Sequence, residues 1–268
     1  MFDENRRYGV EIECGRANKY DIAEELSDYG IYCEVEGYNH RLRDHWKIVS
    51  DASLTMPNSF ELVSPPLKGI ESLQQVQIVS SVLKGQNAKV DKNCGIHVHH
   101  EAKWFRDNHF QKLYTLYRRG ERAIDSIVSP SRRNGTYCRS LSGLPSTSDA
   151  LPHLRQSRYY KINFQSYTRH GTIEFRHHQG TIESKKIINW ILFTQRMMSR
   201  SRNKTPISTS TELIQQRYFY TFHMLLRVLG IEYHFRKNNP IALDLVNHLN
   251  SRRVKFGYDP VNLEGVSA

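Results

Sequence analysis

The sequence contains no apolar run long enough to cross a bilayer, and it begins with a polar, charged stretch, MFDENRRYG. A membrane-spanning helix needs about 20 predominantly apolar residues. A secretory leader needs a basic segment followed by an apolar one. We therefore expect a soluble, cytoplasmic protein that makes no membrane contact.

Cysteine is scarce, with four residues and no C-x-x-C pair. A chain of 268 residues can bury about three quarters of its unfolded surface, so it needs no disulfides to fold. We expect reduced thiols. A zinc site that uses Cys94 and His97 is disfavoured, because strand alternation places these two side chains on opposite faces.

Several catalytic signatures are also missing. The sequence has no G-x-x-x-x-G-K-[ST] phosphate loop, no G-x-G-x-x-G turn, no H-E-x-x-H motif and no G-x-S-x-G elbow. The main support for P-loop, dinucleotide-binding, zincin and hydrolase mechanisms is therefore absent. A bound nucleotide would have to be held by residues of a sheet and by metal ions.

Acidic residues are outnumbered by basic ones, 27 against 38, which gives a formal net charge of +11. Residues 196–268 contribute eleven basic and five acidic side chains to this balance. Such an excess favours anionic partners. It supports an alternative function, a basic metal-dependent nucleic-acid-binding protein or nuclease, because nucleases also use carboxylates and histidines to hold metals.

Three segments alternate polar with apolar side chains, as a strand does when one of its faces is buried. The polar positions are Glu11 and Glu13 in YGVEIEC, His97 and His99 in CGIHVHH, and Glu174 and Arg176 in GTIEFRHH. Taken singly, each pair also fits solvated or structural side chains. If the three strands share one sheet, their polar face suits Mg²⁺ or Mn²⁺, with an arginine for phosphate.

Hydrophobic periodicity and turn residues predict further elements. Strands are expected near 31–36, 46–51, 60–64 and 160–164, and helices over 20–29, 69–85, 107–128, 183–199, 211–229 and 240–250. Residues 129–157 are rich in Ser, Pro, Gly and Arg. We expect them to form a long loop, either a lid or binding segment or a mobile surface insertion.

Several motifs follow one another in a characteristic order. They are YGVEIE (8–13), WKIVSDASL (46–54), ELVSP (61–65), CGIHVHH (94–100), Arg158-Tyr159 with Asn163, and TIEFRHHQGT (172–181) followed by Trp190. Between about residues 6 and 200, this series resembles the amidoligase family of the carboxylate–amine ligase superfamily. The catalytic core of that family is similar to those of glutamine synthetase and gamma-glutamylcysteine synthetase.

The resemblance implies an α+β fold, with a curved, mainly antiparallel sheet, helices on its convex face and the active site on its concave face. We divide the sequence accordingly into an amidoligase-like catalytic domain, 1–200, and a basic, helical C-terminal extension, 201–268. The resemblance says nothing about the role of this extension.

The resemblance also implies a reaction. ATP and two or three Mg²⁺ or Mn²⁺ ions would phosphorylate a carboxylate, and an amine would then attack the acyl phosphate to give an amide. Glu13 and Glu61 would hold one metal near the substrate, and Glu11, His97 and Glu174 would hold another near the ATP phosphates. Glu61 is the one carboxylate found in the ELVSP segment, where larger relatives supply two, so the number of metals stays open.

The remaining candidates concern phosphate and amine. Arg176 would contact the transferring phosphoryl group, and His99 and Arg158 are further phosphate-binding candidates. Asp51 would bind or deprotonate the amine, or it caps a turn at the end of a strand. Small molecules or peptides fit as carboxylate and amine substrates, whereas nucleic acid bound through the basic extension is the less favoured partner. A homo-oligomer is compatible with the sequence.

Overall fold

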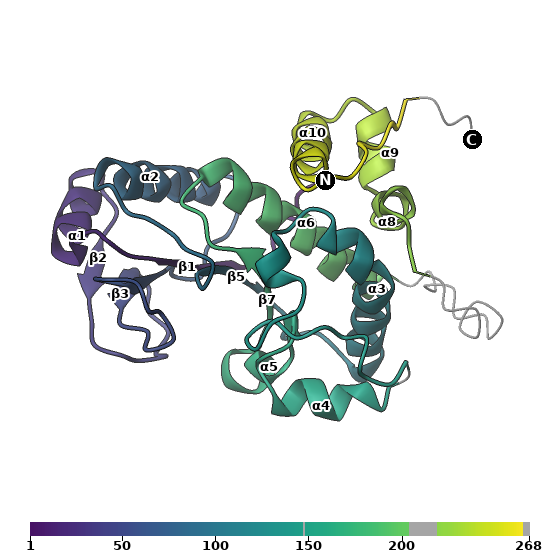
Figure 1. Ribbon diagram of the computed structural model, residues 1–268, viewed down its shortest axis with the longest axis horizontal. Helices are drawn as coiled ribbons and strands as arrows, with labels where there is room; N and C mark the ends of the chain where they lie inside the picture. The colour runs from purple at the N-terminus through teal and green to yellow at the C-terminus, as the bar shows by residue number, and fades with distance from the viewer. Residues whose placement is uncertain (147, 204–218, 265–268) are drawn as a thin grey trace. The chain divides into compact units, whose positions relative to one another are not determined.

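The computed structural model describes residues 1–146, 148–203 and 219–264. It is a mixed α+β protein (Figure 1), and its seven-stranded sheet has the order β2-β3-β4-β1-β5-β7-β6. Strand pairs β1–β4, β1–β5 and β3–β4 are antiparallel, and β2–β3 is parallel. The predicted α+β class with a mainly antiparallel sheet is confirmed.

The chain divides into two compact units. The first, here called the sheet unit, comprises Glu4–Glu101 and Glu174–Ile191; the second, called the helical unit, comprises Met1–Asp3, Ala102–Ile173 and Leu192–Ala268. This division follows contacts in space and does not test the predicted boundary near residue 200, which stays a prediction.

The sheet unit holds most of the strands. They are β1 (Tyr8–Cys14), β2 (Cys33–Val35), β3 (Trp46–Val49), β4 (Phe60–Val63), β5 (Gly95–Glu101) and all but the first residues of β7 (Thr172–Gln179). Its helices are α1 (Lys19–Asp28), α2 (Ser72–Gly85) and the beginning of α6 (Ser184–Arg202). Asn18 caps α1 by accepting a hydrogen bond from the backbone N–H of Tyr20.

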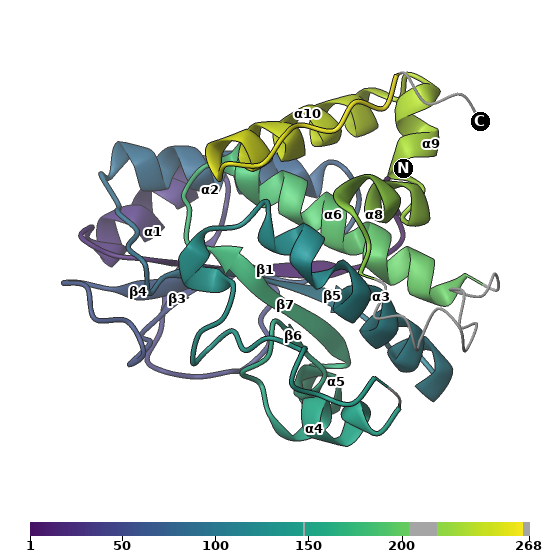
Figure 2. The same ribbon diagram turned by 45° about the vertical axis from the view of Figure 1, so that its right-hand side comes forward.

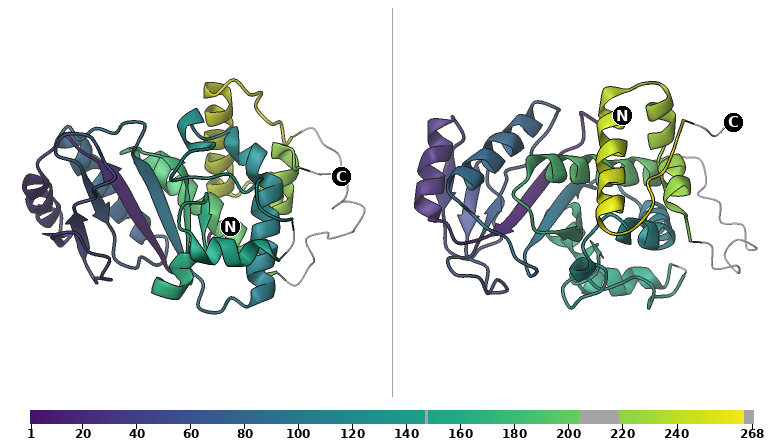
Figure 3. Two further views of the ribbon diagram at one scale, coloured as in Figure 1. Left: turned by 60° about the horizontal axis from the view of Figure 1, so that its bottom comes forward. Right: turned by 45° about the horizontal axis from the view of Figure 1, so that its top comes forward.

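One face of this sheet is apolar. Ile12 pairs with Leu62 on one side and Ile96 on the other, and all three side chains are fully buried. Helices α1 and α2 lie side by side along the sheet (Figures 1 and 2), and the purple and blue helices of Figure 3 repeat this arrangement. Because side chains alternate along a strand, the opposite face receives the polar residues.

The helical unit is built from short and long helices. They are α3 (Asp107–Asp125), the 3-10 turn η1 (Pro130–Arg132), α4 (Ala150–Gln156), α5 (Gln165–His170), the rest of α6, α8 (Phe222–Val228), α9 (Ile231–Arg236) and α10 (Pro240–Lys255), with the short strand β6 (Ile162–Asn163). Helix α3 packs against α4 and α8, and α9 packs against α10. Asn239 caps α10, with Pro240 in the first turn.

The structure corrects three expectations. The prediction of a loop through residue 157 is wrong for Ala150–Gln156, which form α4 because Leu151 and Leu154 are buried. Helices α5 and α9 were not predicted. Of the helix expected over 211–229, residues 211–218 lie outside the described residues, and α8 occupies Phe222–Val228.

Two further observations concern membrane contact and cysteine. Across residues 1–146, 148–203 and 219–264, no helix is both long and apolar enough to traverse a bilayer. All four cysteines are buried, and none is paired in a disulfide.

Gly180, which follows β7, approaches Cys94 more closely than any other residue type would allow. Its N–H donates to the Cys94 carbonyl at 2.7 Å, and a Cβ on Gly180 would lie 2.4 Å from the Cβ of Cys94. We predict that Gly180→Ala lowers the free energy of unfolding by about 1–3 kcal/mol, because the two backbone segments must separate. Urea unfolding would measure this loss.

Gly37→Ala is the matched control in the same unit, because nothing lies within 4 Å of a Cβ added there. Equal stability of the two variants would contradict the packing argument.

Candidate active site

The strand register arranges the polar face of the sheet unit in rows. One row runs through Lys47, Val63, Glu11 and His97, on β3, β4, β1 and β5. The next row on the same face runs through Val49, Glu61 and Glu13, on β3, β4 and β1. Neighbours in such a row have Cβ atoms about 5 Å apart. The register therefore brings together carboxylates that are far apart in the sequence.

His97 lies at the centre of these carboxylates. Its Nδ1 is 3.0 Å from Glu11 Oε2, 3.5 Å from Glu174 Oε1 and 4.0 Å from Glu61 Oε1, and its Nε2 is 3.5 Å from Glu13 Oε1. Only 3% of the His97 residue surface is exposed. The imidazole is thus within ion-pair distance of four carboxylates from three other strands.

These side chains form two groups with the composition of a metal site. Glu11, His97 and Glu174 form the first group, and Glu13, Glu61 and His97 form the second. In each group, one ligand atom per residue lies within 4.8 Å of the others. Several carboxylate oxygens with one imidazole nitrogen suit Mg²⁺ or Mn²⁺. The structure brings together all five residues that were predicted as ligands, and their role as ligands stays a prediction.

The carboxylates hold protons with very different affinities. Burial, together with the charges of Glu11 and Glu13, raises the pKa of Glu61 well above its usual value. Burial would also raise the pKa of Glu11, but His99 and His97 hold that pKa well below its usual value. Both shifts reflect how closely these charged side chains are packed, and a divalent cation would relieve the repulsion among the carboxylates.

Arg176 supplies a cation on the β7 side of the first group. Its guanidinium forms a direct ion pair with the carboxylate of Glu174. Burial acts to raise the pKa of Glu174, but the charge of Arg176 keeps this pKa below its usual value. An arginine always carries its charge and can bind phosphate oxygens through two parallel hydrogen bonds.

The other predicted residues take up different positions. His99 Nε2 is 3.1 Å from Glu11 Oε1, so His99 adjoins the first group. Asp51 lies just beyond β3, where its carboxylate accepts a hydrogen bond from the Ser53 N–H at 2.8 Å. This contact is the turn cap that was predicted as the alternative to a role in amine binding. Asp51 also contributes to the raised pKa of Glu61. Arg158 belongs to the helical unit, where its guanidinium carbon lies 5.4 Å from the centre of the Tyr159 ring.

Sequence reasoning missed Lys47, which shares a row with Glu11 and His97. The segment WKIV contained the signal, because Trp46 and Ile48 are apolar and alternation places Lys47 on the opposite, polar face. The lysine is buried, with 3% of its surface exposed.

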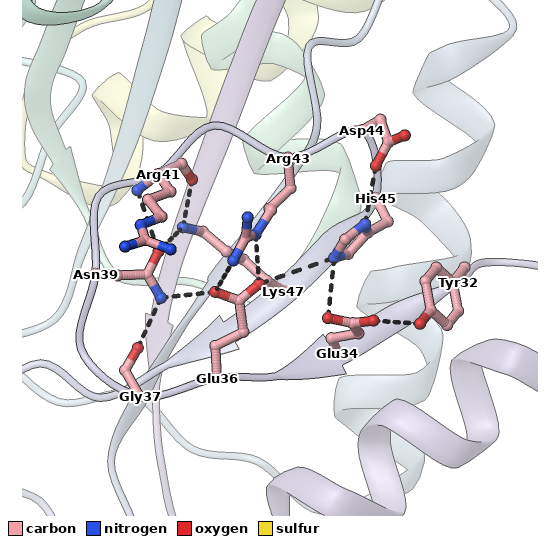
Figure 4. A network of polar contacts seen from close by, with 10 residues as sticks. All are labelled: Tyr32, Glu34, Glu36, Gly37, Asn39, Arg41, Arg43, Asp44, His45 and Lys47. Carbon is pink, nitrogen blue, oxygen red and sulfur yellow. Dashed lines mark hydrogen bonds and ion pairs between the residues drawn. The ribbon is translucent and has the colours of Figure 1, made fainter.

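A third group of possible ligands, Glu34, Glu36 and His45, lies near the parallel strands β2 and β3 (Figure 4). His45 Nε2 is 3.4 Å from Glu34 Oε2 and 3.8 Å from Glu36 Oε1. Glu36 already accepts hydrogen bonds from Arg43, which is the main reason that its pKa is lowered to about 2. The charge of this carboxylate is balanced within the chain, and we assign no metal to it.

Comparison with known proteins gives one family. The family described as "Putative amidoligase enzyme" matches residues 4–143 and 145–198. A cryo-EM structure of glutamine synthetase from Plasmodium falciparum is similar with a TM-score of 0.41 and 11% sequence identity, over 94% of this chain and 72% of that chain. A likeness of this size supports no inference about activity. No curated protein matches the chain.

The raised pKa of Glu61 predicts how divalent cations stabilise the protein at different pH values. An acid with a raised pKa favours folding at low pH, and this contribution is lost as the pH rises through the folded-state pKa. A cation that uses Glu61 must displace its proton, so cation binding strengthens over the same range. We predict a larger increase in Tm on adding MnCl2 at about pH 8 than at about pH 5.5.

Thermal unfolding with and without MnCl2 would measure this difference. Glu61→Gln removes the titrating group and should shrink the pH dependence of the increase, whereas the surface variant Glu183→Gln should leave it unchanged. An increase in Tm that does not depend on pH would argue against Glu61 as a ligand.

Proposed function

The chain belongs to the amidoligase family, and we propose that it joins a carboxylate to an amine by using ATP to activate the carboxylate as an acyl phosphate. The single observation that supports this proposal most is the geometry around His97. Two ligand groups share that imidazole, and Arg176 adjoins one of them through Glu174. Phosphoryl transfer needs such a set, because it depends on positioning and on charge neutralisation.

Glu11, His97 and Glu174 would hold one divalent cation, and Glu13 and Glu61 would hold a second. When bound, the cations would neutralise and align the phosphate oxygens of ATP and the carboxylate. The chain prepares the first group by keeping Glu11 ionised, since His97 and His99 hold its pKa low. Gly95 fixes Glu13 in the second group by donating its backbone N–H to Glu13 Oε2 at 2.5 Å.

Arg176 would contact the phosphoryl group as it moves from ATP to the carboxylate. Charge spreads over the three phosphoryl oxygens in that transition state, and a guanidinium already held in place by Glu174 stabilises them without reorganising. In the second step, the amine nitrogen bonds to the acyl carbon, the carbon–oxygen bond to phosphate breaks, and inorganic phosphate leaves. The amine must lose a proton, and Asp51 at the end of β3 is the candidate to accept it.

The first test is nucleotide binding. We expect the wild-type chain to bind ATP only when Mg²⁺ is present, and we expect Glu11→Gln and Glu174→Gln each to weaken this binding at least about 10-fold, since each removes a charged ligand. Calorimetric titration would measure the affinities. Glu183→Gln is the matched control, because Glu183 forms an exposed ion pair with Lys84. Wild-type protein that is folded but binds no Mg–ATP would contradict the proposal.

The second test is turnover, with hydroxylamine as a general amine that traps acyl phosphates. We expect ADP release to require both a carboxylate and Mg²⁺. Arg176→Lys keeps the charge but loses the paired hydrogen bonds, so it should lower the rate of ADP release by about 10²–10³ while Mg–ATP affinity falls much less. If Mg–ATP binds and no pair from a broad set of carboxylates and amines yields ADP, ligase activity is ruled out.

A further inference from the structure

Lys47 is a buried cation whose partners are uncharged (Figure 4). Its ammonium donates to the Asn39 side-chain oxygen at 2.8 Å and to the Arg41 backbone carbonyl at 2.7 Å. Within the described residues, no carboxylate oxygen lies within the 4.0 Å ion-pair distance of this nitrogen. Lysine is almost never buried without a charged partner, because removing an ammonium from water is costly.

The helical unit contains a buried lysine that is paired with carboxylates. Lys161 is fully buried, and its ammonium lies 2.7 Å from a carboxylate oxygen of Glu121 and 2.7 Å from one of Asp125. The chain thus neutralises Lys161 completely, whereas it leaves Lys47 with two neutral acceptors and a third N–H. A structural ion pair accounts for Lys161, whereas the charges of Glu36, Glu61 and Glu11 act on Lys47 only from beyond ion-pair contact.

The segment between β2 and β3 holds the Lys47 ammonium in a fixed position. Asn39, which accepts from Lys47, also donates to Glu36 Oε2 at 2.7 Å. Arg43 donates to both carboxylate oxygens of Glu36. The carboxylate nearest in this network is therefore occupied by Arg43 and Asn39, and the ammonium is preorganised rather than free to rotate away.

Lys47 lies on the flank of the ligand groups opposite Arg176. In the sheet order, β3 and β7 lie on opposite sides of the three strands that carry the other ligands, β4, β1 and β5. Val63 is the single residue between Lys47 and Glu11 in their row. Strands are about 4.8 Å apart, so Lys47 and Glu11 start about 10 Å apart, a gap that a small ligand can bridge.

We propose that Lys47 binds a second anionic group of the carboxylate substrate, so that the acyl substrate is a dianion such as a dicarboxylate. This inference rests on the proposed function, because one carboxylate must lie at the ligand groups while the other reaches Lys47. A nucleotide phosphate is the other possible source of an anion. Arg176 lies on β7, on the side of the ligand groups opposite Lys47. We therefore assign the phosphates to the β7 side and the second anionic group of the substrate to Lys47 on β3.

The test measures binding without turnover, by calorimetry in MgCl2 with the β,γ-imido analogue of ATP. The probes are three matched series: succinate, glutarate and adipate; the monocarboxylates butyrate, valerate and hexanoate; and the corresponding ω-amino acids. We expect at least one dicarboxylate to bind about 10- to 100-fold more tightly than its monocarboxylate, as a charge-assisted hydrogen bond would give. The ω-amino acids should bind most weakly, because their ammonium would face Lys47.

Variants of Lys47 test whether this residue causes the preference for dicarboxylates. Lys47→Met should lose it, so that dicarboxylate affinity falls about 10- to 100-fold to the level of the monocarboxylate. Lys47→Arg should retain part of the preference. The surface variant Lys89→Met should retain all of it. If Lys47→Met fails to fold, as judged by circular dichroism, the ranking of the three series on the wild-type chain decides.

The outcomes separate this inference from the proposed function. Failure of the wild-type chain to bind the nucleotide analogue would count against the ligase itself. Nucleotide binding with equal affinities for mono- and dicarboxylates, or with no binding of any acid, would overturn only the assignment of Lys47. Loss of nucleotide affinity in Lys47→Met, with the dicarboxylate preference intact, would also overturn it, because Lys47 would then serve the phosphates.

Discussion

Mutual repulsion among the glutamates on one sheet face is the constraint on which the rest of this unit depends. The carboxylates of Glu11, Glu13, Glu61 and Glu174 all lie within 4.0 Å of the His97 ring nitrogens. The ligand atoms of each group lie within 4.8 Å of one another, and two ionised carboxylates at that separation repel each other by about 3–4 kcal/mol at an effective dielectric constant near 20. The other face of the sheet is apolar and is covered by α1 and α2. The burial of that face offsets the cost of holding the glutamates together. The raised pKa of Glu61 reflects this repulsion, which bound cations would relieve.

The alternation of residue types predicted much of this site from the sequence. Period two in YGVEIEC and CGIHVHH places Glu11 with Glu13 and His97 with His99 on a single face, and the structure has both pairs there. Alternation does not determine which strands are neighbours or in what register. That Glu13 lies opposite Glu61, and Glu11 opposite His97, follows from the central position of β1, which only the folded sheet provides.

Elements that depend on tertiary burial were harder to predict. Helix α4 is seven residues long and includes a proline, so its local propensity is weak, and the burial of Leu151 and Leu154 stabilises it. Arg158, which follows this segment, was predicted to bind phosphate, yet composition cannot place a side chain. The burial of Lys47 could not be predicted for a related reason. Alternation shows which face of the sheet Lys47 occupies, but its burial depends on the segment between β2 and β3, which folds over it.

A buried charge that contacts an opposite charge of the same chain has a different effect on stability from a buried charge that lacks such a contact. The ion pairs of Lys161 with Glu121 and Asp125 close a network inside the helical unit, and removing one partner there would leave a buried charge. In the sheet unit, Lys47 has no carboxylate within ion-pair distance among the described residues, and the glutamates of the ligand groups lie close to one another. Such a site lowers the stability of the free protein and regains it from whatever binds, so affinity and stability are linked at the same residues. An anion that meets Lys47 and cations that meet the glutamates would then stabilise the same folded state.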